Sequence, residues 1–382
     1  MTVLHRHPDA PPLHVQLANI IKEKIMVGVW RQGETIPTEK ELCAEFDVAR
    51  GTVRQALQAL EADGFLRREQ GRGTFVIFGN LPPQTVKTTR NRLAFIVPYV
   101  RDSSVLTILM GFQQAAEREN YAVAFHHVNN DVEQQTRVIE TLYQEGVAGI
   151  ALYPVDSEVL KPVDRFVQAG FPIVLIDRYL KHLSTDFVMS DHFGGAICAV
   201  RYLLDQGHRR IGFVTWLSPA VSMEHRFLGY KQALREQSIE PDPTLVCHVE
   251  GYPTVDLTPL RTYLSNEGRP SAVFAANDQI AIALYRAAAS IGLTVPADLA
   301  IVGFDNLDIA EQLSPPLTTL SQQFLEIGHK TAEVLLRRIQ GDTNPYYQVT
   351  IAPELIVRES CLPYAHMQVP RAYVDQVRSK EH

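Results

Sequence analysis

The 382-residue chain lacks several features that would narrow its class at once. No apolar stretch reaches the length that spans a bilayer, which argues against a membrane protein. The first twelve residues hold His, Arg and Pro but no apolar core of a secretory signal, so we expect a cytoplasmic protein. The four cysteines are scattered without a C-x-x-C pair, which argues against a metal or redox centre and fits reduced thiols in the cytosol: Cys43, Cys198, Cys247 and Cys361.

Nucleotide-binding and catalytic motifs are also missing. A Rossmann G-x-G-x-x-G would be expected after the apolar run at 93–98, but the chain reads Val97-Pro98-Tyr99-Val100-Arg101 there, and no P-loop occurs. No Ser-His-Asp arrangement or metal-ligand spacing stands out. We therefore predict no catalytic residues, no metal and no cofactor, and a nucleotide-dependent enzyme is only a remote alternative.

An overall excess of positive charge is absent too, since the formal net charge is −7. The deficit is not spread evenly, because residues 1–78 hold ten Lys and Arg against ten Asp and Glu. The basic residues of this balanced segment gather in its second half, at Arg50, Arg54, Arg67, Arg68 and Arg72. A local basic surface for nucleic acid is therefore compatible with the acidic composition.

Residues 1–78 predict a small helical domain with a β-hairpin. Apolar residues recur at helical spacing from Leu13 to Met26, and Thr38 with Glu41 forms a capping box for a second helix that reaches about Phe46. A third helix, from about Arg50 to Ala62, has a narrow apolar stripe and an outward face that carries Arg54 and Gln55. Arg and Gln on such a face can read base edges in a major groove.

Two short strands follow this helix around a Gly-Arg-Gly tip. The tip, Gly71-Arg72-Gly73, allows tight backbone turns and exposes Arg72 to phosphate or to a minor groove. Helix, helix, outward-polar helix and hairpin together predict a winged helix-turn-helix that binds double-stranded DNA.

The segment 12–78 closely resembles the winged helix of the GntR family. The likeness rests on Gly33-Glu34-Thr35-Ile36-Pro37-Thr38-Glu39-Lys40-Glu41-Leu42, on Val48-Ala49-Arg50-Gly51-Thr52-Val53-Arg54-Gln55-Ala56-Leu57, and on Gly64-Phe65-Leu66 through Gly71-Arg72-Gly73-Thr74-Phe75-Val76. It implies that Lys40, Arg50, Thr52 and Arg54 contact an operator, that Gly71 and Arg72 supply the wing, and that Glu39 orients the arginines. The full predicted DNA-binding set is Thr38, Glu39, Lys40, Arg50, Thr52, Arg54, Gln55, Gly71, Arg72 and Gly73.

Residues 79–92, with Pro82-Pro83 and little apolar content, are expected to be a linker. Beyond Leu93, nine short apolar runs alternate with amphipathic stretches, which predicts parallel sheets in two doubly wound lobes. Ligands of such sheets bind beyond the carboxyl ends of the strands. Polar groups at those ends, and one arginine early in a helix, make the candidate site: Asp177, Arg178, Arg226, Asn277 and Asp305.

Carboxylates, an amide and guanidinium groups suit a ligand rich in hydroxyls, because each hydroxyl both donates and accepts hydrogen bonds. Trp216 can stack on the apolar face of a sugar ring. Asp at a strand end commonly caps the next helix instead, and this reading is strong for Asp191 and Asp278.

Residues 92–360 resemble the LacI-type regulatory domain and type I periplasmic sugar-binding proteins. The likeness rests on Pro172 to Arg178, Ser190 to Ala196, Gly207 to Phe213, Arg226 to Tyr230, Ala275 to Asp278, Ile301 to Asn306, and Pro315 to Leu320. It implies that Asp177, Arg226, Asn277 and Asp305 hold effector hydroxyls, with Arg178 as an extra contact, and that the chain crosses between lobes near Ser190, Leu320 and Pro345. A GntR-type reader on a LacI-type sensor resembles the AraR group of carbohydrate repressors.

The sequence therefore predicts an α+β winged helix-turn-helix at 1–78 and an α/β periplasmic-binding-protein-like domain at 93–360. We place lobe 1 at about 93–190 and 321–345 and lobe 2 at about 191–320 and 346–360, and we expect a polar, disordered tail at 361–382. The linker does not look like the hinge helix of typical LacI proteins, so coupling to DNA must run through dimer geometry.

The expected function is a cytoplasmic repressor of carbohydrate-utilisation genes. It would bind a two-fold operator as a homodimer and leave it when a pentose or similar sugar binds. Two alternatives stay open. The effector can be a purine, a nucleoside or a phosphorylated sugar, and it can act as a corepressor rather than as an inducer. A transport binding protein is disfavoured by the DNA-binding head and by the lack of a signal.

Overall fold

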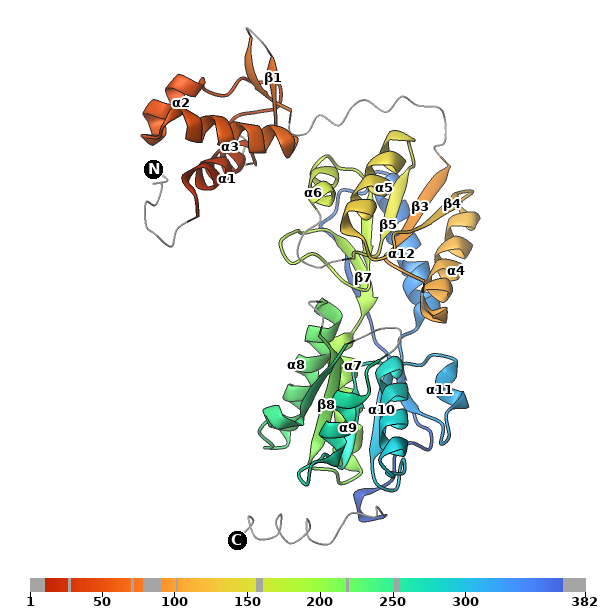
Figure 1. Cartoon of the computed structure of the whole chain (residues 1–382). Coiled ribbons are helices and arrows are strands. Elements are labelled where there is room, and N and C mark those ends of the chain that lie inside the picture. The colour runs from red at the N-terminus through yellow and green to blue at the C-terminus, as the bar shows by residue number, and fades with distance from the viewer. Residues whose placement is uncertain are drawn as a thin grey trace. The chain divides into compact units, whose positions relative to one another are not determined.

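The computed structural model describes residues 11–26, 29–69, 72–77, 91–100, 102–155, 161–217, 220–250 and 255–366. The chain forms two compact units. The smaller consists of residues 1–85, drawn from red to orange in Figure 1, together with the segment Val163–Phe171; the larger contains the remaining residues from Val86 onward.

The N-terminal unit contains three helices and a two-stranded hairpin: α1 (Leu13–Met26), α2 (Glu39–Phe46), α3 (Arg50–Ala62), β1 (Leu66–Glu69) and β2 (Gly73–Val76). The apolar faces of the helices meet in one core, in which Leu17, Leu42 and Val53 are fully buried. The predicted bounds of the first and third helices are confirmed. This small core holds α3 so that its polar face remains exposed.

Local signals set the ends of these elements as the sequence predicts. Thr38 caps α2, and its hydroxyl and Glu41 form the predicted capping box. Asp47 ends α2 in the left-handed conformation, at φ 49°, which turns the chain into α3. The hairpin pairs Leu66 with Val76, and the amide of Ile36 donates to the carbonyl of Thr74, which fastens the segment before α2 to the wing.

The larger unit contains two six-stranded sheets, one in each lobe. The sheet of lobe 1 has the order β13-β7-β6-β5-β3-β4 and is parallel throughout: β3 (Arg92–Val97), β4 (Ala122–His127), β5 (Gly149–Leu152), β6 (Ile173–Ile176), β7 (Asp186–Ser190) and β13 (Gln348–Ile351). The sheet of lobe 2 has the order β14-β12-β11-β10-β8-β9, with only β14 antiparallel: β8 (Ile211–Trp216), β9 (Val246–Val249), β10 (Ala272–Ala275), β11 (Ala300–Asp305), β12 (Thr318–Ser321) and β14 (Glu354–Ile356).

Helices cover these sheets, as Figure 1 shows. Lobe 1 carries α4 (Ser103–Arg118), α5 (Val132–Gln144) and α12 (Phe324–Ile339), and α6 (Lys161–Gln168) lies between β5 and β6 in the chain. Lobe 2 carries α7 (His192–Asp205), α8 (Val221–Glu236), α9 (Thr258–Ser265), α10 (Asp278–Ser290) and α11 (Ile309–Gln312). Short 3-10 turns occupy Pro243–Leu245 and Tyr364–His366. None of the helices in the described parts of the chain is long and apolar enough to cross a membrane.

All nine predicted strands are present, and most of their apolar runs are buried, with the edge strands β4 and β9 more exposed. The predicted third crossing at Pro345 was wrong, since β13 pairs with β7 in lobe 1, with Gln348 opposite Phe187. The chain enters lobe 2 only after Ile351, at Ala352-Pro353. The sequence does not mark β13 as a buried strand, because its alternate residues are exposed.

Two predicted domain boundaries also differ from those in the structure. Arg92 belongs to β3 rather than to the linker, most of which (79–90) lies outside the described residues. The predicted tail begins too early, because Cys361 is buried in the core of lobe 2 and the amide of Tyr364 donates to the carbonyl of Gln206. Residues 367–382 lie outside the described part of the chain.

Candidate functional site

A cluster of arginines around one carboxylate forms the candidate DNA-binding face of the N-terminal unit. Glu39 opens α2 and accepts hydrogen bonds from Nε of Arg50 at 2.8 Å and from Nε of Arg54 at 3.2 Å. Arg68, on β1, donates to the same carboxylate at 3.0 Å. One negative charge therefore orients three positive ones.

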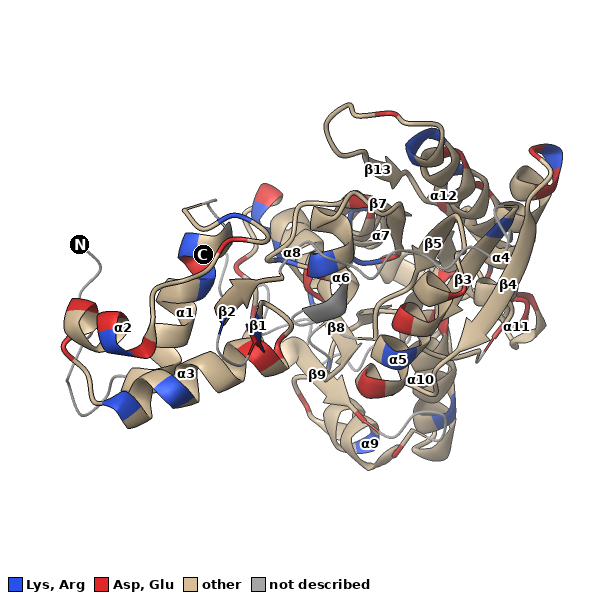
Figure 2. Cartoon of the chain, turned by 90° about the horizontal axis from the view of Figure 1, so that it is seen from above, with Lys and Arg blue, Asp and Glu red and all other residues tan. Residues whose placement is uncertain are grey.

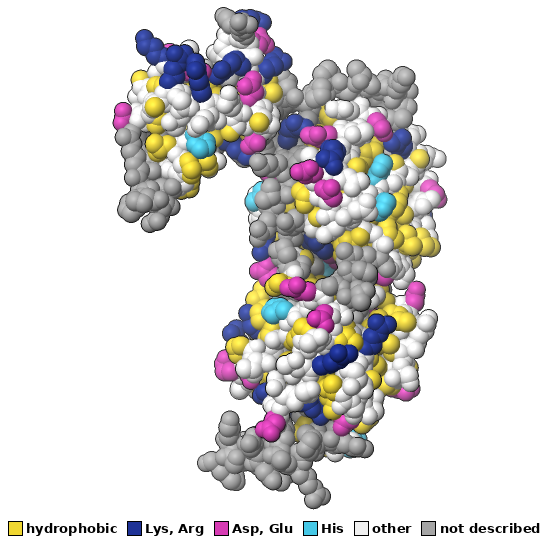
Figure 3. Space-filling view, viewed as in Figure 1, with side chains coloured by type: hydrophobic (Ala, Val, Ile, Leu, Met, Phe, Trp, Pro, Cys, Tyr) yellow, Lys and Arg dark blue, Asp and Glu magenta, His cyan; other side chains and the backbone are white. Residues whose placement is uncertain are grey.

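The cluster leaves positive charge facing solvent. The side chains of Arg50 and Arg54 are 70% and 55% exposed, whereas that of Glu39 is only 16% exposed. The hydrogen bond from Arg50 is the main cause of a lowered pKa at Glu39, so this carboxylate stays charged and its partners stay oriented. Blue Lys and Arg segments lie along α2 and α3 in Figure 2, and the dark blue side chains gather along one edge of this unit in Figure 3.

Most of the predicted DNA-binding residues share one groove with this cluster. Seven of the ten line it: Thr38, Glu39, Lys40, Arg50, Arg54, Arg72 and Gly73. Thr52 is partly buried and Gln55 is exposed on α3, outside the groove lining, and Gly71 lies outside the described residues. The hydroxyl of Thr38 is used by the helix cap, and Arg72 pairs with Glu69 at 2.9 Å. Arg68 was missed as a site residue, although it is among the basic residues that gather in the second half of this segment.

The second site is a cleft of about 470 Å³ in the larger unit, at the carboxyl ends of the strands. All six residues predicted for the effector line it: Asp177, Arg178, Trp216, Arg226, Asn277 and Asp305. The first two come from lobe 1 and the other four from lobe 2. The structure thus brings together side chains that are up to 128 positions apart in the sequence.

On the lobe 1 side, Asp177 is held by a buried polar group. It follows β6 with φ 64° and accepts a hydrogen bond of 2.6 Å from the hydroxyl of Tyr153. Arg178 lies over the ring of Tyr153 at 4.8 Å and places its Nε 3.7 Å from Asp177. Burial alone would raise the pKa of Asp177, but the nearby His192, Arg178 and Tyr153 hold it well below its usual range, so it remains a carboxylate.

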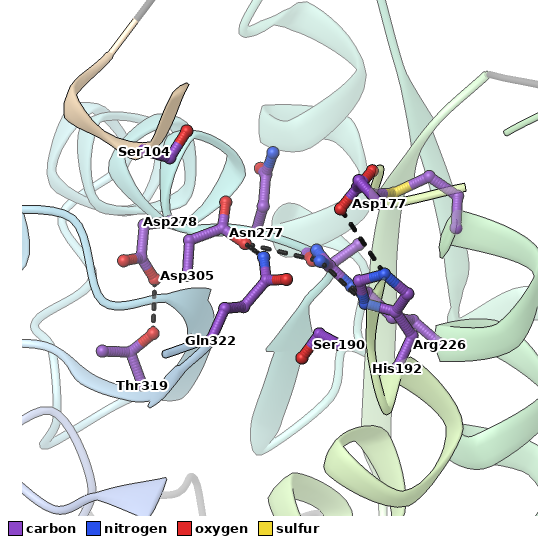
Figure 4. Close-up of polar contacts among 12 residues, drawn as sticks. Ser104, Asp177, Ser190, His192, Arg226, Asn277, Asp278, Asp305, Thr319 and Gln322 are labelled. Atoms are coloured by element: carbon purple, nitrogen blue, oxygen red, sulfur yellow. Dashed lines mark hydrogen bonds and ion pairs between the residues drawn. The ribbon is translucent and has the colours of Figure 1, made fainter. Parts of the chain in front are cut away.

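On the lobe 2 side, Arg226 is buried and is already engaged by the protein. Its guanidinium lies over the ring of Phe304 at 3.8 Å and donates to the carbonyl of Ala276. It also lies 3.4 Å from Asp305 and 3.2 Å from Nδ1 of His192 (Figure 4). These partners fix the plane of the guanidinium in the cleft wall.

Asp305 is the most constrained carboxyl group of the cleft. Its backbone φ is 122°, a region that residues with a side chain rarely adopt, and Gln322 donates to it at 2.5 Å. Burial is the main cause of its strongly raised pKa, and the nearby Asp278 and Asp102 add to the effect. A carboxyl group that is readily protonated can donate as well as accept a hydrogen bond.

The two predicted capping residues behave differently. Asp191 caps α7, as predicted, and accepts from the amide of Gly194 at 2.8 Å. The prediction for Asp278 was wrong, because Asn277 caps α10 while Asp278 is buried and accepts from Thr319 and from the amide of Leu307. Burial raises the pKa of Asp278 to about 7. The oxygen of Asn277 is used by the cap, which leaves its NH2 group to face the cleft.

Sequence reasoning missed four residues that shape the cleft: Asp102, Tyr153, His192 and Gln322. Three of them directly follow or nearly follow a strand: Asp102 after β3, Tyr153 after β5 and Gln322 after β12. The strand-end rule would have found Tyr153, but Gln322 follows β12, which was not among the predicted strands, and Asp102 lies five residues beyond β3 as the cap of α4. His192 lies two residues beyond β7 as the first residue of α7, and it reaches the site through Arg226 and Asp177.

The cleft contains nearly equal numbers of opposite charges. Two guanidinium groups, Arg178 and Arg226, face the carboxyl groups of Asp102, Asp177 and Asp305. If Asp305 is protonated, two carboxylates still balance the two cations. Within the described ranges, no group of three or more His, Cys, Asp or Glu side chains is arranged to hold a metal ion.

Two family models match separate parts of the chain. Residues 13–76 match the model of the bacterial regulatory proteins of the gntR family, and residues 200–361 match that of the periplasmic binding protein-like domain. Among solved structures, the transcriptional regulator CelR in complex with cellobiose has a TM-score of 0.67 at 25% identity and covers 85% of this chain and 100% of its own. A LacI family regulator from Enterococcus faecium with bound ribose has a TM-score of 0.60 at 24% identity, with 71% and 99% covered.

Curated relatives align along most of the chain. The arabinose metabolism transcriptional repressor of Geobacillus stearothermophilus is 29% identical and covers 91% of this chain and 97% of its own length. The ribose operon repressor of Haemophilus influenzae is 29% identical over 66% of this chain and 76% of its own. The transcriptional repressor CytR of Escherichia coli is 28% identical, with 86% and 98% covered. These relatives are transcription regulators rather than enzymes, as predicted. The chain thus joins a GntR-type helix-turn-helix domain to a periplasmic-binding-protein-like domain and is homologous to the arabinose and ribose repressors.

Proposed function

We propose that the chain is a transcriptional repressor that binds a two-fold operator as a homodimer and releases it when a neutral sugar, a pentose or a similar polyol, occupies the cleft. The observation that carries this proposal is the charge balance among the six predicted residues that converge from both lobes. Carboxyl, amide and guanidinium groups together satisfy hydroxyls that both donate and accept. The names of the relatives, repressors of arabinose metabolism and of a ribose operon, support a sugar of this size.

The contacts that the two arginines already make within the protein disfavour a phosphorylated sugar. Arg226 is engaged by Ala276, His192 and Asp305. Arg178 lies over the Tyr153 ring and donates at 3.4 Å to the Tyr153 hydroxyl and to the carbonyl of Val155, so that only its Nε, beside Asp177, is without a hydrogen-bond partner among the described residues. A phosphate needs two or more converging cations with donors to spare. The carboxyl groups would also repel it.

A nucleoside is the second candidate, and the aromatic lining of the cleft favours it. Tyr99, Tyr153 and Trp216 all line the cavity, and the rings of Tyr99 and Tyr153 lie 6.4 Å apart. A base could stack on such rings while its ribose uses the polar groups.

Titration of the full-length chain with single compounds tests the effector. The panel is L-arabinose, D-ribose, cytidine, adenosine and ribose 5-phosphate, and calorimetry measures the binding of each compound. We expect a neutral pentose to bind, and we expect Asp305→Asn to lose that binding without a change in fold. Tighter binding of ribose 5-phosphate than of ribose would overturn the neutral-sugar assignment.

DNA release is measured with an operator obtained by in vitro selection. Fluorescence anisotropy should show that the pentose weakens binding about 5- to 150-fold, the usual range of coupling between sites. Asp305→Asn should bind the operator and ignore the pentose. If the pentose does not change operator binding by the unsubstituted protein, the proposal is contradicted.

A further inference from the structure

A buried histidine connects the two halves of the cleft. His192 begins α7 directly after β7, where the chain passes from lobe 1 to lobe 2, and it is fully buried. Its Nδ1 lies 3.2 Å from Nη2 and 3.4 Å from Nε of Arg226. Its Nε2 lies 3.6 Å from Oδ1 of Asp177. Figure 4 shows the imidazole between these two side chains.

The partners of His192 determine which of its nitrogens carries the proton. A guanidinium group only donates hydrogen bonds, so Nδ1 beside Arg226 must accept and has no hydrogen. The proton of the neutral ring is therefore on Nε2 and faces Asp177. Burial, followed by the charge of Arg226, lowers the pKa of His192, which keeps the ring neutral at pH 7.

The contact between His192 and Asp177 is incomplete. Nε2 is buried and has no hydrogen-bond partner among the described residues, because 3.6 Å is beyond hydrogen-bonding distance. A buried donor without a partner is unfavourable, and a bond to a carboxylate is a strong replacement. A shift of less than about 1 Å between Asp177 and the ring would bring this pair within range.

We propose that His192 is a positioning residue that links Asp177 of lobe 1 to Arg226 of lobe 2, and that effector binding completes its hydrogen bond to Asp177. The inference rests on the proposed function in so far as the cleft binds an effector. The bound form then gains a contact inside the protein that the free form lacks, and such a difference is what lets a ligand favour one arrangement of the lobes.

The surroundings of His192 make the link sensitive to pH. Five titratable or charged groups lie around its ring: Asp177 after β6, Asp191 on its own turn, Arg226 and His225 of α8, and Asp305 of β11 beyond Arg226. His225 bonds Tyr179 instead, at 3.3 Å. His192 also lines a second cavity of about 540 Å³ outside the effector cleft, which gives protons a route to the ring. Protonation would put a hydrogen on Nδ1 against Arg226, so effector affinity should fall as the pH drops through the pKa of His192.

Calorimetry with L-arabinose and D-ribose, at pH 8.0 and then at steps down to the lowest pH at which the chain stays folded, tests the link. Whichever of the two sugars binds, we expect His192→Phe to weaken its binding by roughly tenfold or more at pH 8.0, because the substitution removes both ring nitrogens. His192→Asn offers an acceptor and a donor, so it should recover most of the affinity and lose the pH dependence. His208→Gln is the control, since His208 is also fully buried but bonds Ser271 and Leu362 away from the cleft. It should lower the melting temperature without changing sugar affinity. Equal affinity in His192→Phe and the unsubstituted protein would overturn the proposal.

A second measurement needs no sugar. In the full-length chain with ¹⁵N-labelled histidine, the resonance lost in His192→Phe should report a neutral ring with the proton on Nε2. Asp177→Asn and Arg226→Lys should each shift that resonance. A ring protonated on Nδ1 at pH 7 would overturn the link. If the tautomer is as expected but neither sugar binds, the link is supported and the assigned effector class fails.

Discussion

The two candidate sites use the same residue types in opposite ways. On the N-terminal unit, three arginines surround Glu39 and are largely exposed, so positive charge remains in excess at the surface. In the cleft, Arg226 and Arg178 are buried and matched by carboxyl groups. Exposed excess cations suit a polyanion such as DNA, whereas buried and balanced charges suit a neutral ligand rich in hydroxyls. Burial and charge count, rather than residue identity, distinguish the two.

The largest expected effect comes from removing Arg226. Arg226→Met leaves the carbonyl of Ala276, Nδ1 of His192 and the carboxyl group of Asp305 buried without their partner, and each buried polar group left unpaired costs about 1–3 kcal/mol. Urea unfolding, followed by the fluorescence of Trp216 in a Trp30→Phe background, should show this loss. Arg137→Met, which removes an exposed arginine of α5, should change stability by less than about 0.5 kcal/mol. Equal effects of the two substitutions would contradict the contrast between buried and exposed arginines.

The next largest effect should be the loss of stability of the larger unit at low pH. Burial lowers the pKa of His208 to about 4, below its ordinary value of 6.5. The unfolded chain therefore takes up a proton first, and stability that is present above pH 6.5 is lost as the pH falls towards 4, by on the order of 3 kcal/mol. The unfolding free energy of the larger unit, measured between pH 7 and pH 4, should fall less steeply in His208→Gln. An unchanged slope would exclude His208 as the cause.

Removing one arginine of the exposed cluster should have an intermediate effect. Arg54→Ala should weaken binding to the selected operator by about 1–3 kcal/mol, because it removes a contact to a base or phosphate. The pentose should still stabilise this variant against heat, since the cleft is untouched. Arg137→Ala is the control and should bind DNA normally. Loss of pentose stabilisation in Arg54→Ala would show a structural effect instead.

The smallest expected effect on stability belongs to Glu39. Glu39→Gln should change the free energy of unfolding by less than about 1 kcal/mol, because its partners are exposed to solvent. It should reduce discrimination between the operator and random DNA, since Arg50 and Arg54 lose the group that orients them. Anisotropy with both DNAs measures this ratio. Unchanged discrimination would mean that Glu39 does not orient the arginines.

Features with a local cause were predictable from the sequence. The capping box at Thr38 and the apolar stripe of α3 depend on neighbouring residues, so their helix bounds were predicted closely. The strand-end residues Asp177 and Asp305 were found because parallel strands place their carboxyl ends together. Features that depend on distant partners were not predictable. β13 is recognised only by its pairing with β7, and His192 only by Arg226 and Asp177, which lie in different parts of the chain.

The contrast between the two sites is tested most directly by the salt dependence of both binding reactions in one preparation of the full-length protein. Each phosphate neutralised by the arginine cluster should make the logarithm of operator affinity fall by about 0.9 for each unit of log salt concentration. Pentose affinity should stay nearly constant over the same range, because a neutral ligand in a buried, balanced cleft releases no counterions. A pentose affinity that falls in parallel with operator affinity would contradict the account.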